Sequence, residues 1–233
     1  MVICFVLMGI GAALCIFYGY ERIVKKSNLS IALKGVVSFV FVILGIYSHF
    51  MSSKAGFGIL IVLGLISGLL GDVFLALRRH IKDKSDLFLT CGFASFGIGH
   101  VFYLSAIILK YFSSSKILYF ILPFVLACLL AVAFALLGGK LGLEYGQFKT
   151  AIAVYGTLLM TAMFLCISMC IMTNFTETHL IIMMIGLVLF AASDMVLSKK
   201  YFGGQPDSGP LTVTNIATYF SGQFLIAFSL YFI

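Results

Sequence analysis

Residues 117–137 read ILYFILPFVLACLLAVAFALL and contain no charged side chain. An uninterrupted apolar run of this length matches the roughly 20 residues that an α-helix needs to cross the hydrocarbon core of a bilayer. The rest of the chain has the same character, since 62% of its 233 residues are hydrophobic and only 10% are charged. Soluble domains carry about a quarter charged residues, so the sequence predicts a membrane protein with no room for a soluble domain.

Breaks rich in charge, glycine or serine divide the chain into eight apolar segments. We therefore expect an all-α, polytopic transmembrane bundle of eight helices that forms a single domain over residues 1–233. The first segment has no basic region before it and no small-residue cleavage site after it, so we interpret it as a span and not as a signal peptide. The predicted spans lie near residues 2–20, 31–50, 56–77, 88–109, 117–137, 151–172, 179–198 and 213–232.

The basic residues are concentrated in every second loop, which predicts the orientation of the chain in the membrane. The first, third, fifth and seventh loops are predicted to face the cytoplasm, and both termini the opposite side. The even loops hold only Lys54, Lys110 and Lys116, and Lys34 falls inside the second span. The net charge of +7 follows from this asymmetry, so nucleic acid is not expected as a partner. The odd loops carry Arg22, Lys25, Lys26, Arg78, Arg79, Lys82, Lys84, Lys140, Lys149, Lys199 and Lys200.

Two carboxylic acids lie inside predicted spans, Asp72 near the end of the third and Asp194 near the end of the seventh. A carboxylate in hydrocarbon costs roughly 2.5–3.5 kcal/mol even on a mild insertion scale, so an acid there indicates function. The two spans run in the same direction and each acid closely precedes a basic loop, so both are expected at one depth, where they can meet. The alternative is that each acid only accepts an interhelical hydrogen bond or pairs with a loop lysine.

Five further polar residues are candidates for supporting or substrate-binding roles. His100 and Tyr103 lie one turn apart on the fourth span, and Tyr219 and Gln223 lie one turn apart on the eighth. Lys34, about a turn inside the second span, is a candidate counter-ion for a carboxylate or for a lipid phosphate. For each of them the alternative is ordinary packing, hydrogen bonding between helices or snorkelling to the interface.

Two patterns concern the packing around these acids. Gly64 and Gly68 precede Asp72 on one helix face and predict either close helix packing or a groove for a lipid chain. The two halves of the chain also have related spacings, with a polar residue of the next helix following each acid at a similar distance. This relation suggests a 4+4 internal duplication with the site between the halves.

No metal or cofactor is predicted. His49 and His179 fall near the outer ends of their predicted spans, His80 lies in a predicted cytoplasmic loop and His100 lies at mid-membrane, so the four cannot easily converge. The sequence also has no HExxH, GxSxG or P-loop motif. The cysteines lie in apolar runs without zinc-binding spacing, so we interpret them as reduced packing residues. They are Cys4, Cys15, Cys91, Cys128, Cys166 and Cys170.

Taken together, the polar motifs of the spans resemble the YhhN family of eight-span membrane proteins, whose vertebrate members are lysoplasmalogenases. The resemblance covers the third to the eighth span in order. Two positions depart from the family pattern: no Pro follows Lys34, and Phe220 stands where a second Tyr is common. The motifs are Gly71-Asp72-x-Phe74, Gly92-x3-Phe96-x3-His100-x2-Tyr103, Phe190-x2-Ser193-Asp194-x7-Phe202 and Thr218-Tyr219-x3-Gln223-x-Leu225-Ile226-Ala227.

The resemblance implies hydrolysis of the vinyl ether bond of a lysoplasmalogen, giving a fatty aldehyde and a glycerophospho-base. Such a reaction needs a proton donor and a water, and a pair of carboxyls with one protonated and one ionised can supply both. Asp72 and Asp194 are the predicted catalytic residues, in either assignment of the proton. His100 and Tyr103 would orient the pair, and Tyr219 and Gln223 would position water or the glycerol hydroxyl. Lys34, together with Arg78, Arg79 or Lys199 at the cytoplasmic mouth of the site, would receive the phosphate.

The expected partners are a lysophospholipid substrate and the lipid bilayer, while the oligomeric state stays open. The membrane depends on the source: the endoplasmic reticulum in a eukaryote or the inner membrane in a bacterium. Paired intramembrane acids and an internal repeat are also features of transporters, so a proton-coupled small-molecule transporter is an alternative. A non-catalytic lipid-binding protein is another. Aldehyde release from a vinyl ether lipid would discriminate among them.

Overall fold

The computed structural model describes residues 1–52, 55–205 and 208–233, and over these residues the chain is helical with no strand. The prediction of an all-α protein with eight long helices is confirmed for this part of the chain. Lys54, one of the basic residues of the even loops in the predicted orientation, lies outside the described residues. The helices are α1 (Val2–Ile23), α2 (Leu29–Phe50), α3 (Ala55–His80), α4 (Ser85–Tyr111), α5 (Leu118–Leu137), α6 (Lys149–Met172), α7 (Thr178–Phe202) and α8 (Gly209–Ser229).

The helices match the predicted spans but several continue past the apolar segment. α3 ends at His80 and α7 at Phe202, so both include the basic residues with which the predicted loops begin. Basic side chains in the last turn of a helix interact favourably with the negative end of its dipole, which explains why these charges do not end the helix. At the same end of the bundle, Ser208 caps α8 by accepting a hydrogen bond from the backbone N–H of Leu211.

Seven of the described helices, α1 to α7, are long and apolar enough to cross a membrane, as in a multi-pass membrane protein. α8 does not meet that criterion, although its 21 residues would extend about 31 Å. The reason is its position, because α8 packs against α1, α2, α3 and α7. A helix surrounded by other helices can carry polar residues, and α8 contributes Thr212, Asn215, Tyr219 and Gln223 to the interior of the bundle.

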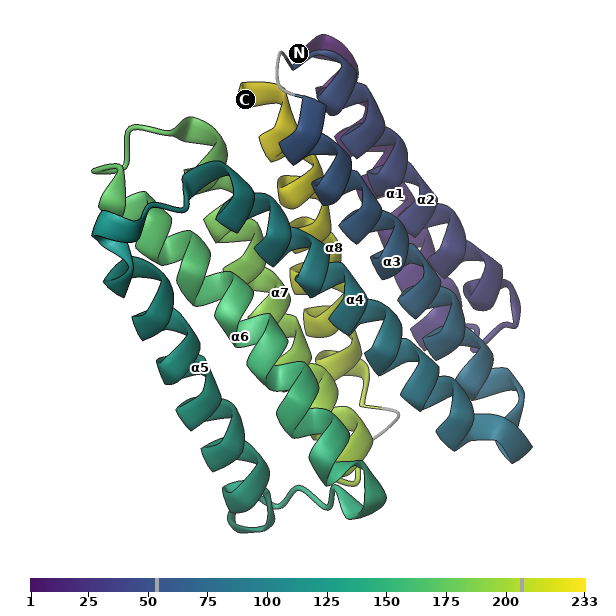
Figure 1. Ribbon diagram of the computed structural model, residues 1–233. Helices are drawn as coiled ribbons and strands as arrows, with labels where there is room; N and C mark the ends of the chain where they lie inside the picture. The colour runs from purple at the N-terminus through teal and green to yellow at the C-terminus, as the bar shows by residue number, and fades with distance from the viewer. Residues whose placement is uncertain (53–54, 206–207) are drawn as a thin grey trace.

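Figure 1 shows α8 in the middle of the bundle, with α1 and α5 at opposite edges. Of the seven apolar helices, α1 and α5 are also the least buried, as expected for helices that face lipid. The two chain ends lie at the same end of the bundle (Figure 1), where the Met1 amino group donates to the Tyr231 hydroxyl at 3.0 Å. The side of the membrane on which this end lies stays a prediction.

Glycines allow two pairs of helices to approach closely. A Cβ added at Gly222 of α8 would lie 2.7 Å from the carbonyl oxygen of Gly186 of α7. A Cβ added at Gly99 of α4 would lie 3.0 Å from the carbonyl oxygen of Gly64 of α3. Gly64 precedes Asp72 by the same interval as Gly186 precedes Asp194. Each acid therefore lies at the same distance along its helix from a close helix crossing. The internal duplication that this spacing suggests stays a prediction.

Substitution of Gly222 by Ala is expected to destabilise the protein, because the new methyl group would overlap the backbone of α7. Overpacking of this kind costs about 1–3 kcal/mol. The thermal unfolding midpoint of the purified protein should fall, whereas the same change at Gly9, which has open space around it, should leave the midpoint unchanged or raise it. Equal midpoints for the two variants would contradict the close α7–α8 crossing.

Candidate active site

A cavity of about 440 Å³, here called the polar cavity, lies among α1, α2, α3, α7 and α8. Both predicted catalytic acids, Asp72 and Asp194, line it. Sequence reasoning placed them at one depth, and they do face a common space. Within the described residues no hydrogen bond joins the two carboxyls, so they occupy separate environments on its wall.

Asp72 is almost completely enclosed, with 1% of its surface exposed. Its Oδ1 lies 2.9 Å from the Lys34 ammonium. Its Oδ2 accepts hydrogen bonds from the Ser38 hydroxyl at 2.5 Å and the Tyr219 hydroxyl at 2.7 Å. A carboxylate with a cationic partner and two hydroxyl donors has the interactions that a buried negative charge requires. The surroundings of Asp72 are therefore suited to a carboxylate group.

The hydrogen bonds continue from Asp72 toward the centre of the bundle. The Gln223 amide donates to the Tyr219 hydroxyl at 3.2 Å, and the Tyr103 hydroxyl donates to the Gln223 carbonyl oxygen at 3.4 Å. Gly64 and Gly68 make room for this chain, because a Cβ at either position would overlap Tyr103 or Gln223. The side chains of Tyr103 and Gln223 thus fill the small-residue face of α3. Of the two alternatives that the sequence left open, this favours close packing over a groove for a lipid chain.

Asp194 has a different environment. It accepts a hydrogen bond from the Tyr155 hydroxyl of α6, and in the described part of the chain it has no ion pair. Unlike Asp72 it is partly exposed to the cavity. Beside it, the Asn215 amide donates to the Ser193 hydroxyl at 2.9 Å and to the Ser193 carbonyl oxygen at 3.2 Å, which fixes this part of α7 against α8.

His100 does not reach either carboxyl. It is 1% exposed, and neither ring nitrogen has a hydrogen-bond partner among the residues described. Its ring packs edge-on against Phe190 at 5.0 Å between centroids and also contacts the rings of Tyr103 and Tyr155. His100 is therefore a packing residue beside Tyr103 and Tyr155. It does not orient the acids directly, as the sequence had led us to expect.

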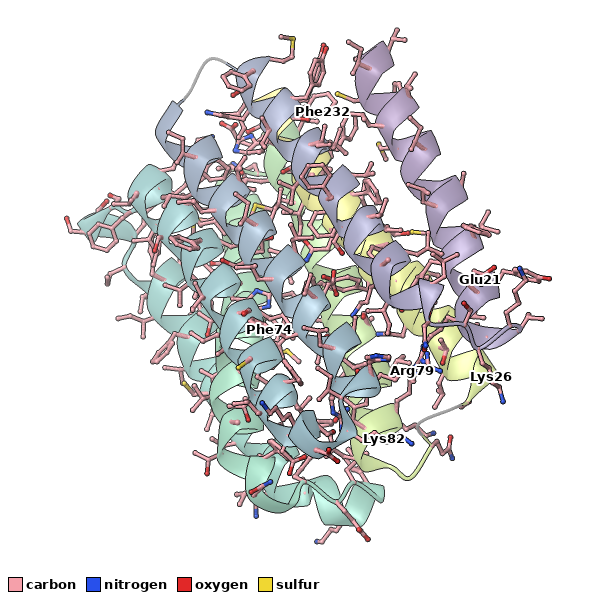
Figure 2. All side chains as sticks on the ribbon, turned by 90° about the vertical axis from the view of Figure 1, so that its right-hand side faces the viewer. Glu21, Lys26, Phe74, Arg79, Lys82 and Phe232 are labelled. Carbon is pink, nitrogen blue, oxygen red and sulfur yellow. The ribbon has the colours of Figure 1, made fainter. Side chains whose placement is uncertain are left out.

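Basic residues gather where the polar cavity reaches the end of the bundle, forming what we call the basic mouth. The Arg22 Nη1 atom is buried there without a hydrogen-bond partner in the described structure. The Arg78 guanidinium stacks over the Tyr201 ring at 4.2 Å and donates to the Ser85 hydroxyl at 3.2 Å. Figure 2 shows Arg79 and Lys82 at this end, opposite Phe232. The basic mouth consists of Arg22, Arg78, Arg79, Lys82 and Lys200.

Two side chains of the site and part of the basic mouth were missed from sequence. Ser38 lies one turn after Lys34 on α2, so its helical spacing could have indicated a shared face. Tyr155 had no such signal, because nothing in its surroundings on α6 marks it as a partner of Asp194. The basic mouth was anticipated in part, since Arg78 and Arg79 were candidates to receive the phosphate, whereas Arg22, Lys82 and Lys200 were interpreted only as evidence of membrane orientation.

The sequence model of the YhhN family matches residues 29–230. The chain belongs to the YhhN family. The YhhN match begins at the first residue of α2 and extends through α8, so it includes every predicted site residue from Lys34 to Gln223. No curated protein and no solved structure matches the chain.

Proposed function

We propose that this membrane protein hydrolyses the vinyl ether bond of lysoplasmalogens, releasing a fatty aldehyde and glycerophosphoethanolamine or glycerophosphocholine. The observation that carries the proposal is the contrast between two carboxyls on one cavity. Asp72 is neutralised by Lys34 at 2.9 Å, whereas Asp194 is bonded to a phenol and has no ion pair within the described residues. Membership of the YhhN family, which is associated with lysoplasmalogenase activity, supports this chemistry.

Asp194 is the proposed general acid. An unpaired carboxylate in a largely apolar surrounding is unfavourable, so this carboxyl holds its proton while Tyr155 donates to its other oxygen. A vinyl ether is cleaved by protonation of the double-bond carbon farther from oxygen, which leaves an oxocarbenium ion at the carbon bonded to oxygen. Asp194 donates this proton and becomes a carboxylate beside the cation. The negative charge then stabilises the intermediate.

Water completes the reaction. The Asp194 carboxylate takes one proton from the attacking water while the water oxygen bonds to the cationic carbon, so the acid is regenerated and a hemiacetal forms. The hemiacetal releases the glycerol oxygen as an alcohol when its hydroxyl proton moves to that oxygen, leaving the aldehyde. One water is consumed and no electrons are transferred. No nucleophilic serine is needed.

Asp72 contributes as a fixed negative charge that positions the neighbouring groups. Lys34 and Ser38 hold its carboxylate, and Tyr219 donates to the same oxygen as Ser38. Because Tyr219 also lines the polar cavity, its ring and hydroxyl form part of the wall that the substrate meets. Gln223 fixes Tyr219 from the opposite side. In this proposal Asp72, Lys34 and Gln223 are positioning residues, and Asp194 touches the reacting atoms.

The basic mouth is the proposed site of the lipid phosphate, because its guanidinium and ammonium groups match an anionic head group. We expect Arg22→Gln to raise KM about tenfold or more with little change in kcat, since a hydrogen bond to a charged group contributes roughly 1.5–3 kcal/mol. Initial rates against the mole fraction of substrate in mixed micelles measure this. Lys84→Gln, a nearby change outside the cavity, is the control. Unchanged KM in Arg22→Gln would contradict a phosphate site at the basic mouth.

A panel of three lipids tests the reaction itself. Detergent-purified protein is incubated with 1-alkenyl, 1-alkyl and 1-acyl lysophosphatidylethanolamine of equal chain length, with and without a chelator. We expect aldehyde from the alkenyl lipid alone, at a rate that the chelator does not change, because the proposed steps use a carboxyl proton and water. Release of fatty acid from the acyl lipid, or no product from any lipid, would contradict the proposal and favour another lipid bond or transport.

A further inference from the structure

A second cavity, of about 250 Å³ and here called the apolar cavity, lies among α5, α6 and α7. Its wall is formed almost entirely by hydrocarbon and aromatic side chains. Phe93 of α4 closes one part of it. The apolar side chains that line it include Leu130, Phe134, Leu159, Met160 and Met195. A wall of this composition suits an uncharged hydrocarbon ligand and not a polar one.

The apolar cavity adjoins the polar cavity, and the two share part of their walls. Asp194, Leu197 and Tyr201 line both. Tyr155, which donates its hydroxyl hydrogen to Asp194, lines the apolar side. The carboxyl of Asp194 therefore stands at the junction between a space lined by charges and a space lined by hydrocarbon.

The apolar cavity also has access to the lipid phase. Leu130 and Met195 line it and are each 46% exposed. α5 lies at the edge of the bundle beside α6 (Figure 1), and as an apolar helix with little of its surface buried it is expected to face the bilayer. A lipid chain can thus reach the cavity from within the membrane without crossing the basic mouth.

We propose that the apolar cavity binds the hydrocarbon chain of a single-chain lysolipid while its phosphate head group occupies the polar cavity. This inference rests on the proposed function and specifies its substrate class and binding mode. The bond between chain and glycerol oxygen then lies at the junction, next to Asp194. The position of the acid thereby determines which bond of the lipid is protonated.

The same arrangement selects against lipids with two chains. A second chain on the neighbouring glycerol carbon would have to lie in the polar cavity, among Arg22, Lys34 and Asp72. Desolvating those charges against a hydrocarbon chain is unfavourable. A free hydroxyl at that position fits the polar wall instead, so the site distinguishes lysolipids from diacyl lipids.

The chain site can be mapped with a lipid that the proposed reaction does not cleave. The probe is a saturated 1-O-alkyl-glycerophosphoethanolamine with a diazirine near the end of its chain, photolysed with the wild-type protein in nanodiscs and located by mass spectrometry. We expect the label on peptides that contain residues 130–134, 152–160 or 191–195. Label confined to α1, α2 or α3 would overturn the proposal.

A pair of variants at Gly156 tests whether space in the apolar cavity is required. Gly156 lines the cavity, and a Cβ there would lie 3.5 Å from the Cβ of Ala131, an ordinary contact. Labelling of Gly156→Ala should be within about twofold of the wild-type level. Labelling of Gly156→Leu should fall at least about fivefold, because a fivefold loss corresponds to the lower end of the usual free-energy cost of overpacking. Gly9→Leu makes the same change in the open space beside α1 and should label normally. Equal labelling of both leucine variants would overturn the proposal.

Competition separates the chain site from the catalytic proposal. Unlabelled alkyl lysolipid should displace the probe, and a diacyl phosphatidylethanolamine should not; equal displacement by both would contradict the single-chain site. Because the probe is saturated, labelling does not depend on turnover. Protein that labels as expected but releases no aldehyde would retain the chain site and refute the reaction, and the reverse pattern would refute the chain site alone.

Discussion

Replacing Asp194 by Asn is expected to lower aldehyde release by about 10²–10⁴-fold, the usual contribution of a general acid. Asn has nearly the same shape and still accepts the Tyr155 hydrogen bond, but it has no acidic proton for the vinyl carbon. The protein should remain folded, since Asp194 has no ion pair in the part of the chain described and none is therefore lost. Initial rates from an aldehyde dehydrogenase-coupled assay measure the effect.

Two controls make the Asp194 result specific. Asp83→Asn applies the same change to an exposed loop residue and should leave the rate unaltered. Photolabelling of Asp194→Asn with the saturated alkyl probe should match wild type, because the chain and phosphate sites are intact. Turnover near the wild-type rate in Asp194→Asn would refute its role as the acid, whatever the stability of the variant.

Replacing Asp72 by Asn is expected to destabilise the protein as well as inactivate it. The change leaves the mostly buried ammonium of Lys34 without the carboxylate that lies 2.9 Å away. Removing one member of a buried ion pair typically costs about 3–5 kcal/mol, because the other charge stays buried and unpaired. The thermal unfolding midpoint in detergent and the rate of aldehyde release should both fall.

The double variant Lys34→Met/Asp72→Asn separates these two effects. With the ammonium also removed, no unpaired charge remains, so the unfolding midpoint should recover toward wild type. Activity should not recover, because the fixed negative charge that holds Tyr219 is still absent. A double variant no more stable than Asp72→Asn would contradict the pairing, and a fully active one would remove Asp72 from the mechanism.

The sequence was sufficient for the helices and for much of the Asp72 network. Polar residues inside apolar spans lack water as a hydrogen-bond partner and therefore pair with one another. The four residues chosen on this ground do lie together, namely Lys34, Asp72, Tyr219 and Gln223. α8 was also located, although its hydropathy falls short of the other seven described helices. Its central place in the bundle, which no local pattern encodes, explains the difference.

The remaining parts of the site depend on packing that a single sequence does not reveal. Tyr155 joins Asp194 only because α6 and α7 lie side by side, and His100 faces the Phe190 ring because of how α4 is rotated. The glycines of α3 predicted either a helix contact or a lipid groove, and the side chains of Tyr103 and Gln223 decide between them. The apolar cavity was not anticipated at all, since four helices contribute to it.

The most direct test of the central claim is the position of deuterium in the aldehyde formed in heavy water. Wild-type protein hydrolyses 1-alkenyl lysophosphatidylethanolamine in D₂O, the aldehyde is reduced at once with borohydride to prevent exchange, and the alcohol is analysed by mass spectrometry. Proton donation to carbon predicts one deuterium on the carbon next to the former carbonyl, with no such product from Asp194→Asn. Aldehyde formed without deuterium at that carbon, or in equal amount by the variant, would contradict acid cleavage of a vinyl ether by Asp194.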